Sequence, residues 1–293
     1  MNPRSLALIA LFIAAIIYGV TFTIAKEVMN THIHPFGFIF IRVGGAMIIF
    51  WILGLFIKGE KSIEKTDFKK IGLAAFFGVG LNMLAFFKGL SYTSPISASV
   101  IMLTAPILVL ILFTILLKER IELKKIIGII IGLIGTSILI LYGKSVGNAT
   151  NANWGNFLVF VNASSYAIYL ILVKKIASKY SPLTFIKWIY TFGLLFVLPF
   201  GLEEFTAVNW NEIPTIIFFE IGYLVIFTTF FAYLINLSAI RYLKPTTLSV
   251  FIYLQPVFAS IFAISLQKDE LNMIKLISAF LIFVGVYLVT QKK

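Results

Sequence analysis

The sequence has no cysteine, only two histidines and few charged residues, and these scarcities exclude several classes of protein. Without cysteine there is neither a disulfide framework nor a thiolate metal site. His32 and His34 form a His-x-His pair with no further ligand nearby, so we expect a solvated loop rather than a metal site. The sequence also lacks a phosphate-binding glycine loop and a catalytic triad. We therefore expect no cofactor, no metal and no enzymatic activity.

Hydrophobic residues dominate what is present. They make up 60% of the 293 residues, and charged residues make up 12%, about half of the ~25% typical of soluble domains. Apolar runs of about 20 residues recur, and each is long enough to cross a hydrocarbon core of about 30 Å. Spans in lipid must satisfy their own backbone hydrogen bonds, which favours helices. The first run continues to about Ala25 without a small-residue cleavage pattern, which indicates a transmembrane helix rather than a signal peptide.

The chain repeats itself at an offset of about 150 residues. The stretch from Tyr92 to Ile140 matches the stretch from Tyr242 to Thr290. Matched positions include Pro95 and Pro245, Pro106 and Pro256, Lys118 and Lys268, Lys125 and Lys275, and Gly135 and Gly285. We therefore divide the chain into a first unit, residues 1–147, and a second unit, residues 148–293.

Ten transmembrane helices are predicted, five in each unit. They are expected near 5–25, 36–57, 71–91, 95–117, 125–143, 154–174, 183–202, 213–236, 246–266 and 272–290. An odd number of helices in each unit turns the second unit upside down relative to the first. The predicted fold is thus an all-α membrane protein of two inverted five-helix repeats, an architecture typical of alternating-access transporters.

Basic residues are distributed unevenly among the predicted loops, and this predicts the orientation. Most of the 24 lysines and arginines fall on the side of the N-terminus, in segments near Arg4, at 58–70, 118–125, 174–179, 241–244 and at the C-terminus. The other side holds Lys26, Lys88, Lys144, Lys268 and Lys275. We interpret the net charge of +12 as topological rather than as a sign of nucleic-acid binding, and we expect both termini in the cytoplasm.

Several short motifs occur in a characteristic order. They are Tyr18-Gly19 with Phe22, Arg42, Leu90-Ser91-Tyr92-Thr93-Ser94, Ala105-Pro106-Ile107, Lys118-Glu119-Arg120, Tyr253-Leu254-Gln255-Pro256-Val257 and Lys268-Asp269-Glu270. Through them the chain resembles EamA-type members of the drug/metabolite transporter superfamily over essentially its whole length. The resemblance implies a transporter, more often an exporter. The sequence departs from the family at Tyr18, where many relatives carry Trp, at Gln255, where a carboxylate is frequent, and at Asp269-Glu270, which replaces a Glu-Arg pair.

Two prolines lie near the middle of predicted helices. Pro106 and Pro256 are symmetry mates in the fourth and ninth helices. Each removes a backbone donor and clashes with the carbonyl four residues earlier, so both helices are expected to kink. On one interpretation the two bends shape a central cavity. On the other they are packing kinks without a role in transport. The symmetric positions of the two prolines favour the first.

Polar side chains at helical spacing indicate where a cavity would lie. Asn162, Ser165, Tyr166 and Tyr169 form one stripe on an otherwise apolar helix, and such residues either bond another helix or line a wet cavity. Asn82 is equally compatible with a helix–helix clamp and with solute contact. The candidate solute-binding residues are Tyr18, Thr21, Asn82, Thr104, Asn162, Ser165, Tyr166, Tyr169, Thr228, Tyr253 and Gln255. This aromatic, hydroxyl-rich set suits amino acids, nucleobase-like or other small amphiphilic solutes better than phosphates, which would need a buried Arg or Lys.

Charged residues within the predicted spans are few. Glu220 lies about seven residues, or ~10 Å, into its helix. Intramembrane carboxylates often mark proton pathways, so Glu220 is the candidate for proton coupling. The alternatives are that it reaches the outer interface or pairs with Lys88. Arg42 and Lys187 lie near helix ends, where they are expected to snorkel, and a structural role is expected for Arg42.

The leading hypothesis is a secondary transporter in the cytoplasmic (plasma) membrane that exports a small organic metabolite such as an amino acid. The sequence has no ATP-binding motif, so the energy would come from a gradient, with a proton as the candidate counter-ion. The alternatives are a flippase of lipids or lipid-linked sugars and a uniporter or exchanger of nucleoside-like or cationic solutes. Gly128, Gly132 and Gly135 predict close packing against the last helix or a second protomer. A monomer is expected, with a homodimer as the alternative.

Overall fold

The apolar runs form helices, and every regular element in the described part of the computed structural model is helical. The described residues are 3–56, 62–117, 123–142, 151–176, 179–239, 242, 251–252 and 254–290. Within them, seven segments are long and apolar enough to cross a membrane: Ser5–Met29, Pro35–Phe56, Lys65–Tyr92, Pro95–Leu112, Ala152–Val173, Pro182–Thr206 and Thr215–Asn236. Shorter apolar helices occupy Gln255–Ser265 and Met273–Gly285. The chain is an all-helical, multi-pass membrane protein.

The elements of the first half follow the predicted order. They are α1 (Pro3–Thr31), α2 (Pro35–Phe56), the 3-10 helix η1 (Lys65–Asp67), α3 (Phe68–Ala75), the π-helical segment η2 (Phe76–Gly80), α4 (Leu81–Tyr92), α5 (Pro95–Met102), α6 (Ala105–Leu117) and α7 (Leu123–Tyr142). The span predicted at 71–91 is therefore assembled from α3, η2 and α4, and the span predicted at 95–117 is divided into α5 and α6.

The second half has a corresponding series of elements. They are α8 (Ala152–Ile176), α9 (Pro182–Thr206), the 3-10 helix η3 (Trp210–Glu212), α10 (Thr215–Tyr223), the π-helical segment η4 (Leu224–Phe231), α11 (Ala232–Ala239), α13 (Gln255–Ser265) and α14 (Met273–Thr290). Residues 246–250 and 253 of the helix predicted at 246–266 lie outside the described residues, and α13 forms its second part.

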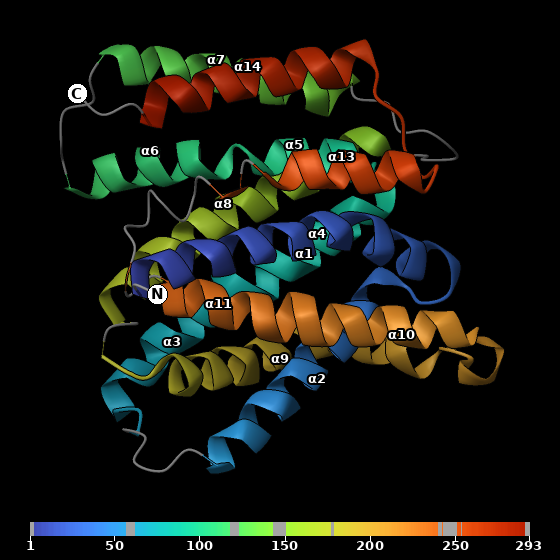
Figure 1. Ribbon diagram of the computed structural model, residues 1–293. Helices are drawn as coiled ribbons and strands as arrows, with labels where there is room; N and C mark the ends of the chain where they lie inside the picture. Colours follow the sequence, from blue (N-terminus) through green and yellow to red (C-terminus); the bar gives the residue numbers. More distant parts are fainter. Residues whose placement is uncertain are drawn as a thin grey trace.

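The helices lie side by side in one bundle, and both ends of the described chain are at the same end of it (Figure 1). Helices α7 and α14 pack together along one edge, whereas α2 packs on α9 at the opposite edge. Other contacts occur in matching pairs: α4 packs on α8 much as α1 packs on α11, and α1 packs on α13 much as α8 packs on α6. The two halves therefore interlock rather than forming separate bodies.

The side chains on the outside of the bundle are apolar. Leu55, Phe56 and Phe219 are 80%, 78% and 72% exposed, respectively. In water, apolar surface on this scale would promote association. In a bilayer the same side chains face acyl chains, so the exposure pattern is the one expected of lipid-facing helices.

Glycines set the approach of α7 to α14. A Cβ atom at Gly285 would lie 2.6 Å from both the oxygen of Gly128 and the nitrogen of Gly132, so only glycine fits there. A Cβ at Gly135 would lie 2.8 Å from Cβ of Leu281. Of the two partners predicted for this glycine face, the structure shows the last helix.

The two predicted proline kinks coincide with helix ends. Helix α5 ends at Met102, and α6 begins at Ala105, directly before Pro106. The turn between them is closed by Thr104, whose backbone nitrogen and hydroxyl both donate to the carbonyl of Ile101, at 3.0 and 2.7 Å. Pro256 is likewise the second residue of α13. The first span is thus divided into two helices rather than bent as one, and in the second span α13 begins directly before Pro256.

Each half also contains a π-helical segment, η2 or η4, which the sequence did not predict. Such wider turns often occur at functional sites. A hydroxyl donates to a carbonyl of each segment: Ser165 Oγ to the oxygen of Phe77 at 2.7 Å, and Thr229 Oγ1 to the oxygen of Leu224 at 2.8 Å. Thr228 of η4 lines the cavity described below, whereas η2 packs behind Tyr169 of its wall.

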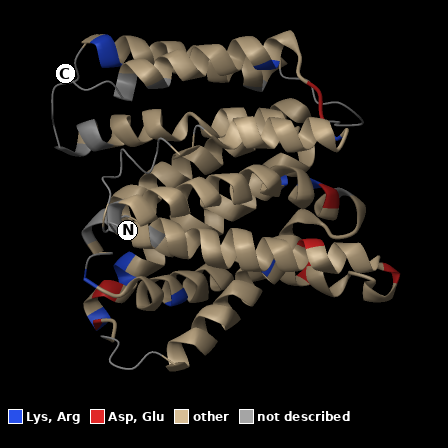
Figure 2. Cartoon of the chain, viewed as in Figure 1, with Lys and Arg blue, Asp and Glu red and all other residues tan. Residues whose placement is uncertain are grey.

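Charged residues concentrate at the two ends of the bundle (Figure 2). The end that holds the termini carries many basic residues, and Lys179 there bonds Asp67 Oδ2 at 2.7 Å and Glu64 Oε2 at 2.5 Å. These bonds raise the pKa of Lys179 above its usual value, and the bond to Asp67 has the largest effect. Most acidic residues of the described part of the chain lie at the opposite end. Basic residues therefore gather at the end that holds the termini, as the predicted topology requires. The side of the membrane that each end faces stays a prediction.

Candidate solute-binding cavity

A cavity lies inside the bundle, between the two halves. Its volume is about 160 Å³, close to that of cavities that take up a benzene-sized molecule. Its walls come from α1, α2, α4, α8, α9, η4, α11 and α13, together with residues at the end of α5 and at 252. The lining is mostly apolar and aromatic, with a few polar groups, as in typical small-molecule sites.

Most of the predicted solute-binding residues line this cavity. They are Tyr18, Thr21, Asn82, Asn162, Tyr166, Tyr169, Thr228 and Gln255. Two others do not line it: Thr104 is fully buried in the turn between α5 and α6, and Ser165 bonds the π segment η2. Tyr253 lies outside the described residues. Pro106 and Pro256 are not in the lining, although their helices begin beside it.

Two hydroxyls join the halves across one wall. Thr21 Oγ1 and Thr228 Oγ1 lie 2.8 Å apart, one on α1 and the other in η4. Thr21 also donates to the carbonyl of Ile17 at 2.7 Å. When Thr21 donates to that carbonyl, its oxygen accepts from Thr228.

Two amides join the halves across another wall. Asn82 Nδ2 donates to the backbone oxygen of Asn162 at 3.3 Å, and Asn162 Nδ2 donates to that of Asn82 at 2.9 Å. Oδ1 of Asn162 is buried without a partner in the described protein. The sequence left a clamp and a solute contact open for Asn82, and the structure shows the clamp within the cavity wall.

Aromatic rings form much of the remaining surface. The rings of Tyr166 and Tyr169 lie 6.2 Å apart on α8. Tyr169 packs on Gly78 of η2, where a Cβ would lie 2.4 Å from Cδ2 of Tyr169. A glycine in the π segment therefore lets the tyrosine come close to the backbone, and this places its ring in the cavity wall.

Three polar residues of the lining were missed by the sequence-based assignment: Arg42, Tyr233 and Asn236. Asn236 Nδ2 donates to the hydroxyl of Tyr18 at 3.2 Å. Thr229, Tyr233 and Asn236 have the same helical spacing as the stripe on α8, so a signal for the last two was present. Arg42 was instead expected to snorkel toward the membrane surface.

Arg42 is buried and does not snorkel, so that prediction was wrong. Its side chain is 2% exposed, and it is the one charged residue among the described residues that line the cavity. Nε and Nη2 donate to Thr229 Oγ1 at 2.9 and 2.7 Å. The guanidinium carbon lies 4.5 Å from the ring centroid of Phe87 and 5.6 Å from that of Phe38. These partners hold the guanidinium inward.

Glu220 lies in α10 and does not line the cavity. Its charged neighbours are Glu27 and Lys268, which form a salt bridge with each other at 3.1 Å. Glu220 Oε2 is buried without a hydrogen-bond partner in the described protein. Lys88 instead stands over the rings of Phe36 and Tyr92, 5.2 Å from each centroid.

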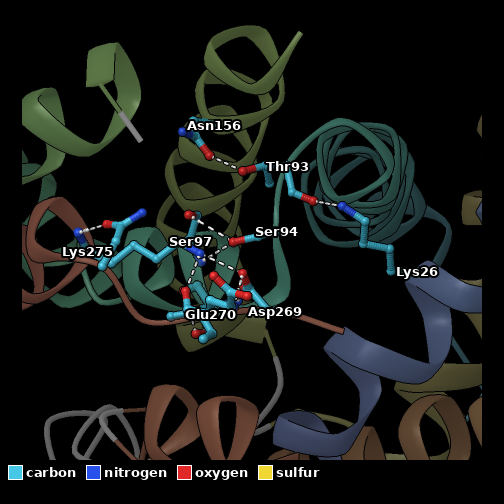
Figure 3. A network of polar contacts seen from close by, with 11 residues as sticks. Lys26, Thr93, Ser94, Ser97, Asn156, Asp269, Glu270 and Lys275 are labelled. Carbon is cyan, nitrogen blue, oxygen red and sulfur yellow. Dashed lines mark hydrogen bonds and ion pairs between the residues drawn. The ribbon is translucent and has the colours of Figure 1, made fainter. Parts of the chain in front are cut away.

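A polar network lies at the end of the bundle opposite the termini, and Figure 3 shows it from close by. We call it the Asp269 network; its members include Lys26, Thr93, Asn156, Asp269 and Lys275. Asp269 accepts from Lys275 Nζ at 2.6 Å and from the backbone nitrogen of Ile96 at 3.1 Å, and both charged side chains are fully buried. Lys26 donates to the carbonyl of Thr93, and the Thr93 hydroxyl bonds Asn156. The network thus joins elements of both halves at the N-terminal end of α5.

The interlocked halves, the broken helices and the central cavity define a multi-pass transporter of two repeat units. The sequence model of the EamA-like transporter family matches the chain twice, at residues 5–141 and 153–291. The chain therefore belongs to the EamA-like transporter family.

Two of the similar proteins are named as transporters. An uncharacterized transporter of Archaeoglobus fulgidus is 30% identical over 287 residues, which cover 97% of this chain and 99% of that one. YetK, an uncharacterized transporter of Bacillus subtilis, is 26% identical over 85% of this chain and 76% of its own. A WAT1-related protein of Arabidopsis thaliana is 24% identical over 96% of this chain and 88% of its own. A solved crystal structure covers 98% of this chain and 97% of its own with a TM-score of 0.63 and 17% identity, which shows the shared fold.

Proposed function

We propose that the chain is a secondary transporter that exports a small organic metabolite, such as an amino acid, through the central cavity. The observation that carries the proposal is the cavity itself, whose walls are built from both halves and hold amide, hydroxyl and aromatic groups around space for a small solute. Hydrogen bonds also join the halves directly in this wall, as between Thr21 and Thr228.

We further propose that residues 1–147 and 148–293 act as inverted halves, with both termini in the cytoplasm. The matched helix contacts, the two π segments and the common position of the termini support this arrangement. The topology is tested by reporter fusions after Lys293 and in the loop at residues 207–209, between α9 and η3. A reporter that works only in the cytoplasm should be active at Lys293 and inactive in the loop, and activity in the loop would overturn the inverted arrangement.

The cavity is tested by cysteine labelling, because the native chain has no cysteine. Cysteines at Thr21 or Tyr166 should react with water-soluble thiol reagents in membranes, and transported solutes should slow the reaction. Val159, on the same helix as Tyr166, is fully buried and outside the lining, and it provides the matched control. If cysteines at Thr21 and Tyr166 react as slowly with the thiol reagents as a cysteine at Val159, the cavity does not admit solutes.

Transport itself is measured in reconstituted vesicles. Preloaded amino acids, nucleosides and lipophilic cations are tested for counterflow, and a fluorescent phospholipid tests for lipid flipping. Counterflow of a small solute that Tyr166→Ala abolishes, with expression unchanged, is the expected result. Lipid flipping without solute counterflow would instead favour a flippase.

A further inference from the structure

Arg42 is anchored on one side and unpartnered on the other. Nε and Nη2 both donate to Thr229 Oγ1, whereas Nη1 is buried with no hydrogen-bond partner in the described protein. Arginine has five N–H donors, and a buried donor without a partner is costly. An arginine with a purely structural role would be expected to have these donors satisfied by its surroundings. Arg42, whose Nη1 has no partner in the described protein, is one of the residues that line the cavity.

The charge of Arg42 also has no counter-ion among the described residues. The ionisable groups near it are the phenols of Tyr18, Tyr190 and Tyr233. No carboxylate in the described part of the chain forms a salt bridge with Arg42. The ring faces of Phe87 and Phe38 offset part of the desolvation cost through cation–π contacts. A guanidinium keeps its proton in proteins, so the positive charge cannot be relieved by deprotonation.

The groups around the rest of the cavity complement a single anionic group. Gln255, the first residue of α13, is in the lining and places the positive end of that helix dipole at the wall. The lining offers hydroxyl and amide groups, such as those of Thr228 and Asn236, but no second charge among the described residues. A cavity volume of about 160 Å³ suits a small organic anion rather than a large headgroup.

We propose that Arg42 binds the anionic group of the transported solute, a carboxylate or an equivalent monoanion, through the Nη1 edge of its guanidinium. This inference rests on the proposed transport function and names the chemical class of its cargo. An arginine edge matches the planar geometry of a carboxylate, which a lysine does not. The Phe86, Phe87 and Tyr166 rings would then contact the apolar part of the solute.

The first test needs only the wild-type protein. The thermal stability of the detergent-solubilised chain is measured with matched pairs of compounds, such as benzoate with benzamide and phenylalanine with phenylalaninamide. Carboxylates should raise the melting temperature, and the paired amides should not. Chloride and phosphate at the same concentration separate an organic anion from an inorganic one. Stabilisation by amides or lipophilic cations equal to that by carboxylates would overturn the proposal, as would stabilisation by inorganic anions alone.

The second test uses variants. Arg42→Gln should weaken carboxylate binding by about tenfold to a hundredfold, and Arg42→Lys should recover part of it, because the charge returns without the planar edge. Lys187→Gln is the control, since Lys187 is a basic residue of α9 outside the lining. Carboxylate binding that is unchanged in Arg42→Gln would overturn the proposal.

A third test measures the electrostatic effect of Arg42 on the cavity through the reaction rates of charged thiol reagents. In a Thr21→Cys background, a negatively charged methanethiosulfonate should react faster than its trimethylammonium counterpart. Arg42→Gln should lower this rate ratio by about three- to tenfold. A ratio that does not change would show that Arg42 does not set the potential of the cavity, even if solute binding cannot be measured in the variant.

These experiments separate the two proposals. Counterflow of neutral or cationic solutes that does not depend on Arg42 would leave the transport function standing and remove the anion site. Carboxylate binding that depends on Arg42, without flux in vesicles, would keep the anion site and remove the transport function.

Discussion

Asn82 and Asn162 each donate a side-chain hydrogen bond to the other's backbone carbonyl, so that the first and second halves of the chain are joined by a reciprocal pair of amides. The distances are 3.3 and 2.9 Å, and both residues are buried in the wall of the cavity. Helices α4 and α8 are thereby fixed in register at this point, where lipid offers no alternative partner for the amides.

Removing one amide should loosen this contact. Asn162→Ala is expected to cost about 0.6–2 kcal/mol of stability, the range of single polar contacts between membrane helices. Thermal unfolding of the solubilised protein measures the loss. Ser164→Ala is the control, because the Ser164 hydroxyl bonds only within its own helix, to the oxygen of Phe160 at 3.0 Å. Equal losses in the two variants would show that the amide pair does not hold the halves together.

Gly285 is expected to tolerate no side chain. Gly285→Ala should destabilise the protein by about 1–3 kcal/mol, since the new methyl would meet the backbone of α7 and neither helix can yield. Gly222→Ala, which adds a methyl with no atom within 4 Å, should leave stability unchanged or raise it by up to about 1 kcal/mol. The comparison is made in thermal unfolding, and a Gly285→Ala protein as stable as wild type would contradict the packing of α7 on α14.

The buried pair of Asp269 and Lys275 should respond strongly to the loss of one partner. Lys275→Met leaves a buried carboxylate without its cation and is expected to cost about 3–5 kcal/mol. Lys268→Met removes the half-exposed salt bridge to Glu27 nearby and should cost no more than about 1 kcal/mol. If the two variants melt at the same temperature, the Asp269 network does not contribute to the stability of this end of the bundle.

Glu220 stays our candidate for proton coupling, now placed outside the cavity and beside Glu27. A proton can drive transport only if its binding and that of the solute favour different conformations. Glu220→Gln should therefore abolish flux driven by a pH gradient in vesicles while solute exchange without a gradient continues. Glu212→Gln, in an exposed segment, should change neither. Full gradient-driven flux in Glu220→Gln would remove Glu220 from the coupling mechanism.

The approximate positions of many helices were predictable, because runs such as 36–57 and 183–202 have the length and apolarity that a bilayer demands. The polar residues of the cavity were largely predictable for a related reason. Asn82 and Tyr166 stand in otherwise apolar helices, and an intramembrane polar group must face another helix or a cavity. The sequence could not show that Ser165, on the same stripe as Tyr166, turns to the carbonyl of Phe77 instead.

Arg42 shows why the rest was not predictable. Its place near a helix end is compatible with snorkelling, and its true direction depends on Thr229 and Phe87, which are distant in sequence. The π segments were missed for a similar reason. A wider turn changes the helix by a single residue, and the stretch Phe76–Gly80 has the composition of an ordinary transmembrane helix.

The hydroxyl of Thr229 limits which residues can replace it as long as Arg42 is present. Its oxygen accepts from two guanidinium nitrogens of Arg42, and its hydrogen goes to the carbonyl of Leu224 inside η4. Only a side chain that is both donor and acceptor at this short reach can do both, which leaves serine and threonine. A library randomised at position 229 should therefore return these two residues when selected for function with Arg42 present. With a neutral residue at position 42 the same library should admit valine and alanine, so the two positions are free to vary only together.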